Sequence, residues 1–145
     1  SSKDEIVVAC AEEAIIRLEN SLIHPAIRNI TKPDKMIDDL YKEARKMAPT
    51  MKFFSQVCSV QSYREIISPT LYRLSRRYKL YAEMFANTLG CSVDMVEPYV
   101  YIALTAVTNY MVFDEKSYIE PQLNLVRDVL KNLLNNKSKP ENQTE

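Results

Sequence analysis

The chain has 145 residues, of which 46% are hydrophobic and 26% charged, a length and composition typical of one globular domain with a buried core. The 19 basic and 19 acidic side chains leave no net charge, which argues against nucleic-acid binding by this segment, since phosphate contacts require an excess of Lys and Arg. The single glycine excludes most all-β and phosphate-loop folds, which need glycine at turns, so an all-α fold is predicted.

The cysteines and the apolar runs indicate the cellular compartment of the protein. Cys10, Cys58 and Cys91 are odd in number and widely spaced, so we interpret them as small core residues of a reduced, cytoplasmic protein. The longest nearly uncharged apolar run, residues 99–113, is shorter than the roughly 20 residues that a membrane-spanning helix needs. It is therefore predicted to be a helix buried on several sides, and no membrane partner is expected.

The first predicted helix covers about residues 3–23. Its apolar residues recur every four positions and form one stripe, consisting of Ile6, Cys10, Ala14, Leu18 and Leu22. Ser2 and Glu5 match a capping box at the start of this helix. Pro25 disfavours helical geometry at His24, so the helix is predicted to end or kink there.

Two shorter helices are predicted next. Thr31 can cap the first of them, which has Pro33 near its start and runs to about Met47. Its inner face is predicted to consist of Ile37, Leu40, Tyr41, Ala44 and Met47. Pro49 follows within the sequence APT and is expected to break the chain and open a short third helix.

Longer helices are predicted in the second half of the chain. Residues 59–90 form a helical segment that Pro69 kinks or restarts, and Gly90 suits a left-handed C-cap at its end. Ser92 is expected to cap the next helix, which covers about residues 93–113.

The last amphipathic helix is predicted over about residues 119–136, which brings the total to about six helices. The polar residues 137–145 are predicted to form a disordered tail. Residues 1–136 are then one domain, and no internal repeat divides them.

The sequence predicts no metal, no cofactor and no catalytic site. His24 is the only histidine, so neither a zinc site of the usual kind nor a di-iron bundle can be assembled, and the residue is interpreted as structural. Asp38, Asp39 and Glu43 are interpreted as a solvated helix face, because no second acidic cluster faces them. No activated nucleophile beside a base is evident, so an enzyme is not expected.

Two features leave room for ligand binding. Arg73, Arg76 and Arg77 share one helix face, where they either receive an anionic ligand or, as we favour, pair with nearby acids on a wetted surface. The chain also holds 9 Tyr, 4 Phe and 6 Met, and side chains of these types line ligand cavities well. A cavity for an apolar or aromatic molecule is therefore predicted.

The opening residues resemble a known family. Ser2, Lys3, Asp4, Glu5 and Ile6, running into a helix, are similar to the segment that ends the helix-turn-helix domain of tetracycline-repressor (TetR) family regulators. The order of helices that follows, with a long helix ending in LGCS before an apolar one, also fits that family. The resemblance implies an orthogonal helical bundle in which residues 1–136 form the effector-binding and dimerisation domain.

The resemblance further implies a mode of action. The three-helix DNA-binding unit would precede Ser2, and the chain would belong to a homodimeric regulator, by default a repressor, that releases operator DNA when a small molecule binds. The last two helices of each subunit would pair. The residues expected there are Val100, Ala103, Leu104, Val107, Leu123, Val126, Leu130 and Leu133.

The effector cavity would lie among the first five helices, and its occupation would shift the first helix as a lever. The residues expected to line it are Leu18, Leu22, Met47, Phe54, Tyr78, Tyr81, Phe85 and Tyr101. Two other functions stay open at this stage. A helical protein-docking module predicts an exposed groove in place of an enclosed cavity, and a small all-α enzyme predicts clustered acids inside a pocket.

Overall fold

The computed structural model describes residues 2–138, and these residues are almost entirely helical, without a strand. The prediction of an all-α fold is confirmed. The elements in chain order are α1 (Ser2–Leu18), the π-helical turn η1 (Glu19–Ile23), α2 (His24–Arg28), α3 (Pro33–Ser59), α4 (Gln61–Leu89), α5 (Val93–Phe113), the short turn η2 (Lys116–Tyr118) and α6 (Glu120–Lys137). The predicted tail falls, apart from Lys137 and Ser138, outside the described residues.

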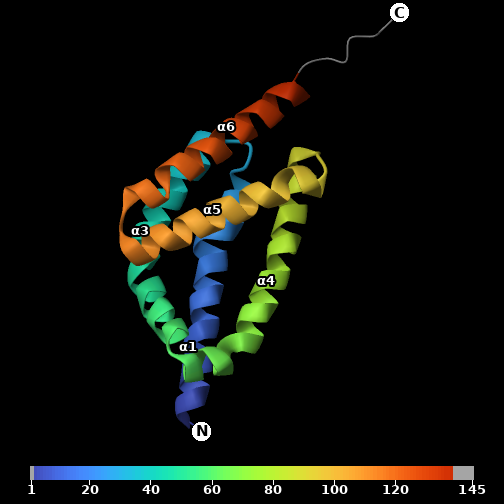
Figure 1. Cartoon of the computed structure of the whole chain (residues 1–145). Helices are drawn as coiled ribbons and strands as arrows, with labels where there is room; N and C mark the ends of the chain where they lie inside the picture. Colours follow the sequence, from blue (N-terminus) through green and yellow to red (C-terminus); the bar gives the residue numbers. More distant parts are fainter. Residues whose placement is uncertain (1, 139–145) are drawn as a thin grey trace, which may run out of the picture.

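The long helices converge at one end of the molecule and are crossed at the other. Figure 1 shows α1, the second half of α3 and the start of α4 meeting near the N-terminus, while α5 and α6 cross the opposite end. Two ion pairs tie the start of α3 to α6, from Asp34 to Arg127 at 3.3 Å and from Asp34 to Lys131 at 3.0 Å. Within residues 2–138 no helix combines the length and apolar character that crossing a bilayer requires.

The path from α1 through η1 to α2 is continuous and changes its hydrogen-bond pattern just before a proline. The His24 amide donates to the Glu19 carbonyl, five residues back, which defines the π turn. Pro25 has no amide hydrogen to donate to the preceding turn. The α-helix therefore ends at Leu18, and a wider turn carries the chain past Pro25 without a loop.

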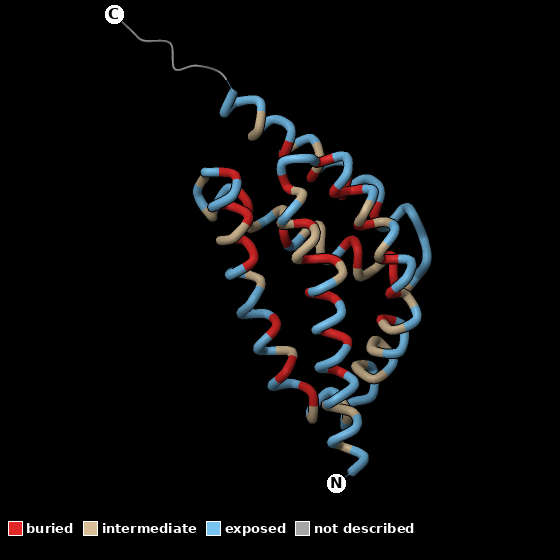
Figure 2. Tube along the Cα trace, turned by 180° about the vertical axis from the view of Figure 1, so that it is seen from behind, coloured by how far each residue is buried: buried red, intermediate tan, exposed pale blue. Residues whose placement is uncertain are grey.

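The apolar stripe of α1 differs from the predicted one in its first half. Its buried residues are Ala11, Ala14, Ile15 and Leu18. Ile6 is 63% exposed and Cys10 is also exposed, so neither is a core residue. The first turns of α1 extend beyond the other helices, as Figure 2 shows by their pale blue and tan colours, so the other described residues leave Ile6 and Cys10 exposed.

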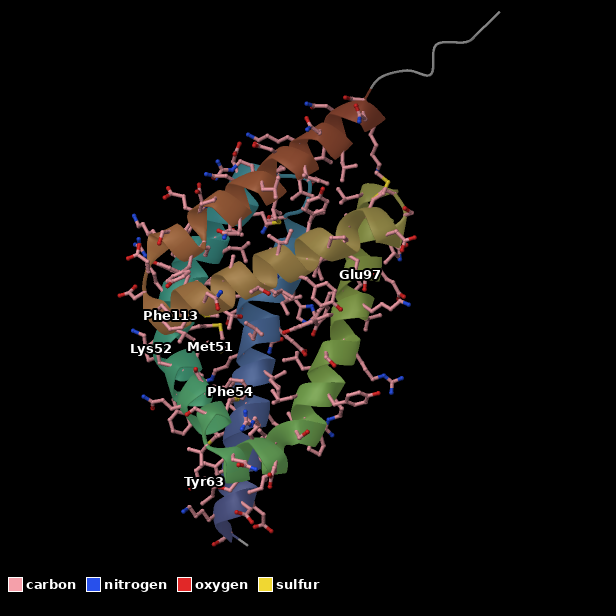
Figure 3. All side chains as sticks on the ribbon, viewed as in Figure 1. Met51, Lys52, Phe54, Tyr63, Glu97 and Phe113 are labelled. Carbon is pink, nitrogen blue, oxygen red and sulfur yellow. The ribbon has the colours of Figure 1, made fainter. Side chains whose placement is uncertain are left out.

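The prediction that Pro49 opens a separate helix is wrong. Instead, α3 continues through Pro49 for 27 residues, and Met47 and Met51 on either side of it are both buried. A proline inside a helix removes one backbone hydrogen bond. Here the unbroken apolar face of α3, packed against its neighbours, outweighs that loss; Figure 3 shows Met51 and Phe54 on this second half of the helix. The second and third predicted helices are one.

The helix ends agree with the sequence in part. Gly90 is left-handed, with φ of 66°, and the Cys91 amide bonds back to the Ala86 carbonyl at 3.1 Å, which is the expected C-cap of α4. Ser92 is the N-cap residue of α5, although its side chain makes no capping hydrogen bond. Thr31 is not the cap of α3, because the N-cap residue is Lys32, directly before Pro33.

Candidate ligand site

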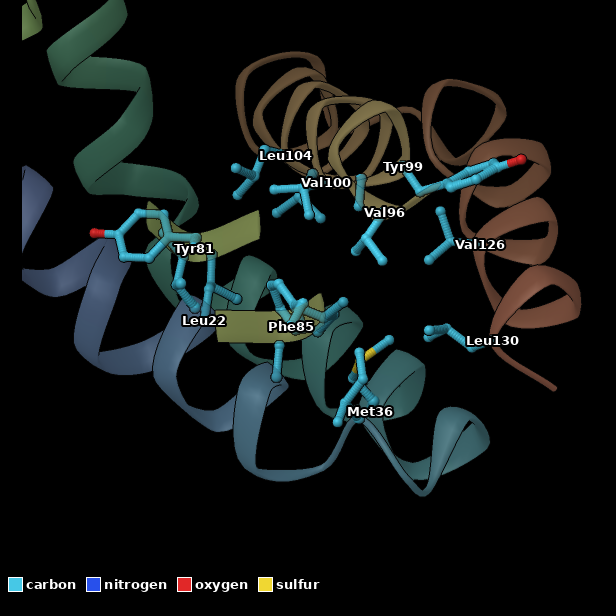
Figure 4. Close-up of a pocket in the computed structure, with 16 residues that line it drawn as sticks. Leu22, Met36, Tyr81, Phe85, Val96, Tyr99, Val100, Leu104, Val126 and Leu130 are labelled. Carbon is cyan, nitrogen blue, oxygen red and sulfur yellow. The ribbon is translucent and has the colours of Figure 1, made fainter. Parts of the chain in front are cut away.

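A cavity of about 70 Å³, partly open to solvent, lies where α5 and α6 cross the ends of the other helices. Sixteen residues from η1, the α2 region, α3, α4, α5 and α6 surround it (Figure 4). They are Leu22, Ile23, Ala26, Ile30, Met36, Leu40, Tyr81, Phe85, Val96, Tyr99, Val100, Ala103, Leu104, Val107, Val126 and Leu130. Four of the long helices, α3, α4, α5 and α6, therefore contribute to one hollow, together with the η1–α2 segment that follows α1.

The lining of this cavity carries no charged side chain. Its only polar side-chain tips belong to Tyr81 and Tyr99, and Figure 4 shows both hydroxyls directed away from the hollow. A polar group moved into such a space would lose its hydrogen bonds to water without replacing them. The cavity is therefore suited to an apolar molecule, whose transfer from water is favourable. Its volume of about 70 Å³ is well below the roughly 300–1,000 Å³ of typical ligand sites, so a drug-sized molecule enters only if the walls move apart.

Helical spacing on α5 builds one wall of the cavity. Val96, Val100, Ala103 and Val107 follow one another at intervals of four and three residues, so they lie on one face of the helix. Ala103 stands between larger neighbours, and its single methyl group leaves open space that a leucine would fill. Phe85 of α4 faces this wall in Figure 4.

A buried carboxylate lies next to Tyr81, one of the lining residues of the cavity. Glu19, in the π turn, is only 6% exposed, and its Oε1 atom is 3.0 Å from the guanidinium of Arg77. Neither Glu19 Oε1 nor the hydroxyl of Tyr81 has a well-aligned hydrogen-bond partner among the described residues. His24 meets the Tyr81 ring edge-on, with 6.4 Å between ring centroids. The Tyr81 ring therefore separates the apolar cavity from a polar cluster.

The environment of Tyr81 favours its neutral form. Burial, and next the adjacent Glu19 carboxylate, raise the pKa of the Tyr81 phenol well above its ordinary 10.0, and Arg77 offsets this only in part. Burial also raises the pKa of Tyr78, whose ring packs edge-on against Tyr101 at 5.6 Å. Both phenols are thus uncharged at neutral pH.

The structure separates the eight residues predicted to line a ligand cavity. Leu22, Tyr81 and Phe85 line it. Leu18 and Met47 are buried in the core away from it, and Phe54 and Tyr78 pack against that core. Tyr101 is 41% exposed. Helical spacing identified seven of these side chains as inward-facing, was wrong for Tyr101, and could not show which of the seven border an empty space.

The residues predicted to pair two subunits lie mainly inside one chain. Six of the eight line the cavity, namely Val100, Ala103, Leu104, Val107, Val126 and Leu130. Leu123 is fully buried, and Leu133 packs against the core. Because this burial arises within a single chain, any pairing surface on α5 and α6 has to be formed by their outward-facing residues.

The other singled-out groups adopt ordinary roles. Asp39 pairs with Lys35 at 2.6 Å and Glu43 with Lys46 at 2.7 Å, and the described residues contain no group of His, Cys, Asp or Glu that could hold a metal ion. Cys58 and Cys91 are half-buried, and burial raises the pKa of the Cys58 thiol. The cysteines are free, and none lies in the lining of the cavity.

Comparison of the chain with models of protein families, with curated proteins and with solved structures found no match. Arguments about function therefore rest on the cavity, the polar cluster behind it and the surfaces around them.

Proposed function

We propose that the chain is the ligand-sensing and dimerisation domain of a TetR-type transcriptional regulator, by default a repressor, whose effector is a small apolar molecule. The observation that carries the proposal is the apolar cavity where α3, α4, α5 and α6 meet the π turn that continues α1. A molecule held there would contact these four helices and would reach α1 through that turn. Operator DNA would be bound by a helix-turn-helix unit joined to α1.

The outer side of α5 supports the dimeric part of the proposal. From Pro98 to Phe113 the helix has no charged residue, and Thr105 and Val112 lie outside its buried face. On α6, Leu125 is 46% exposed on the side opposite the buried Leu123. An uncharged helix face and an exposed leucine on the following helix are features that a second copy can cover.

The polar cluster supports α1 as the element that responds. Tyr81 borders the cavity with its ring and lies beside Glu19 with its hydroxyl, and Glu19 belongs to the turn that continues α1. An effector that displaces the Tyr81 ring would alter the surroundings of that turn. Couplings of this kind typically amount to about 1–3 kcal/mol.

The effector function is tested by a thermal-shift screen of small apolar metabolites. Compounds that raise the melting temperature of the wild-type chain should lose most of this effect with Phe85→Ala, which removes part of the cavity wall. Phe53→Ala, at an aromatic residue that is 53% exposed, is the matched control and should respond as the wild type does. A screen without hits, or equal losses in both variants, would contradict an effector in this cavity.

Dimerisation is tested by light scattering at micromolar concentration. The chain should have the mass of a dimer, and Leu125→Asp should convert it to monomers, since a charge would be buried in the pairing surface. Leu80→Asp places the same charge on α4, at a leucine that is 50% exposed, and should leave the dimer intact. A monomeric wild-type chain would remove this part of the proposal.

A further inference from the structure

A second hollow, which we call the groove, lies on the surface between α1 and α4 and has a volume of about 520 Å³. Ligand sites for small molecules typically measure roughly 300–1,000 Å³, so the groove is within that range. The ribbons of α1 and α4 diverge in Figure 1, and Figure 3 shows side chains from both helices reaching into the space between them. None of its lining residues is shared with the cavity.

The walls of the groove combine apolar and basic side chains. Ile15 and Ile16 of α1 and Leu74 of α4 supply the aliphatic part. Arg73, Arg76 and Arg77 supply three guanidinium groups along one side. A chain without net charge has therefore gathered three cations around one apolar hollow.

Carboxylates neutralise these cations only in part. Arg73 is 2.9 Å from Glu12, at the solvent-exposed rim, and Arg77 is 3.0 Å from the buried Glu19. Arg76 lies 5.9 Å from the centre of the Tyr72 ring and has no carboxylate partner within residues 2–138. Three cations against two carboxylates leave one positive charge in excess, and the Arg73–Glu12 pair is exposed enough for an incoming anion to replace Glu12.

The size of the groove selects the class of occupant. Its lining covers residues 70–77 of α4, a length of about 11 Å at about 1.5 Å per residue. This is too short to seat an amphipathic helix of a partner protein, which would need anchors over several turns. It is long enough for a small molecule with an aliphatic body and one anionic head.

We propose that the groove binds a small amphipathic anion, such as a medium-chain carboxylate, with its head on Arg73 and Arg76 and its aliphatic body on Ile15, Ile16 and Leu74. Arginine suits this role because its planar fork donates two parallel hydrogen bonds to a carboxylate. This site goes beyond the proposed function, because it takes an anion and is separate from the apolar cavity.

The proposal is tested by titrating the whole chain with sodium octanoate at low ionic strength, by calorimetry and by NMR of side-chain methyl groups. Octanoate should bind with a dissociation constant of about 1 mM or tighter, and the methyl signals of Ile15, Ile16 and Leu74 should shift. Acetate, which is the head alone, and 1-octanol, which lacks the charge, should each bind at least about tenfold more weakly at this site.

Two variants locate the site. The double variant R73Q/R76Q should weaken octanoate binding about tenfold or more, while Arg17→Gln, at an exposed arginine of α1 outside the groove, should change it less than about twofold. Arg77 is left in place because its substitution would leave the buried Glu19 without its ion-pair partner. Thermal unfolding of each variant verifies that it is folded before binding is compared.

Every outcome bears on the proposal. Absence of binding, equal binding by R73Q/R76Q and wild type, or equal binding of octanoate and 1-octanol in the groove would overturn it. Octanoate-induced shifts confined to Val100 and Leu104 would also overturn it and would support occupation of the cavity instead. The cavity hypothesis fails separately, through the screen with Phe85→Ala, so the two results are distinguishable.

Discussion

The cavity and the groove are separated by about one helical turn, yet the cavity is lined by apolar side chains and the groove carries three arginines. Leu22 borders the cavity, and Glu19, three residues earlier, faces the arginines. In the same way Tyr81 borders the cavity, and Arg77, four residues earlier, lines the groove. The contrast shows that α4 and the π turn bury apolar side chains at Tyr81 and Leu22, and that one helical turn earlier they form the Arg77–Glu19 ion pair.

The largest effect on stability should come from the apolar core beside the cavity. Leu123→Ala removes a fully buried side chain from α6 and should lower the free energy of unfolding by about 2–5 kcal/mol, since a cavity is left behind. Leu125→Ala, two residues along at a 46% exposed position, should cost about 0.5 kcal/mol or less in the monomer. Urea unfolding measures both, and equal losses would contradict the assignment of the inner and outer faces of α6.

At the polar end, Arg77→Gln should lower the free energy of unfolding by about 1–3 kcal/mol, because it leaves the buried Glu19 without its ion-pair partner. Arg17→Gln, which breaks the exposed pair with Glu13, should cost about 0.5 kcal/mol or less. The double variant R77Q/E19Q should recover most of the loss. A harmless Arg77→Gln would mean that the Glu19–Arg77 ion pair does not stabilise the fold.

Filling the cavity should be better tolerated than overfilling the core. Ala106→Leu places a larger side chain at a buried position outside the cavity and should cost about 1–3 kcal/mol. Ala103→Leu extends into the cavity and should stay within about 1 kcal/mol of wild type, or stabilise the chain. Chemical unfolding compares the two, and an equal penalty would show that no usable space adjoins Ala103.

The substitution with the smallest effect on stability at neutral pH, Tyr81→Phe, should have a measurable effect at alkaline pH. The raised pKa of Tyr81 means that the unfolded chain loses its phenol proton first, so stability is unaffected at neutral pH and falls as pH rises beyond the ordinary 10.0. The slope from this one group is at most about 1.4 kcal/mol per pH unit. Tyr81→Phe should flatten the decline, whereas Tyr72→Phe, at an exposed tyrosine, should not. Unfolding curves between neutral and alkaline pH decide this.

The sequence predicted elements whose signals are local. The left-handed Gly90 and the start of α5 after Ser92 follow from backbone chemistry that few residues can satisfy. Pro49 misled the prediction because its cost is small beside the packing of a 27-residue helix. Ile6 and Cys10 misled it because periodicity cannot show where the neighbouring helices stop.

The site was less accessible to sequence reasoning than the fold. Spacing identified Leu22, Tyr81 and Phe85 as inward-facing, but it could not tell a wall of the cavity from filled core, since that depends on how six segments meet. The α5 residues assigned to pairing line the cavity because the helix turns that face toward its own chain. Glu19 was missed, and its signal is faint: one carboxylate at the end of an apolar stripe.

The central claim is that the cavity accepts an apolar molecule, and methyl NMR with benzene as the probe tests it most directly. We expect saturable shifts of the Val100 and Leu104 methyl groups, with contacts from benzene protons to both, and their loss in Ala103→Leu, whose side chain occupies the space. Shifts that do not saturate, or that appear at the exposed Leu125 while Val100 and Leu104 stay unchanged, would contradict the account.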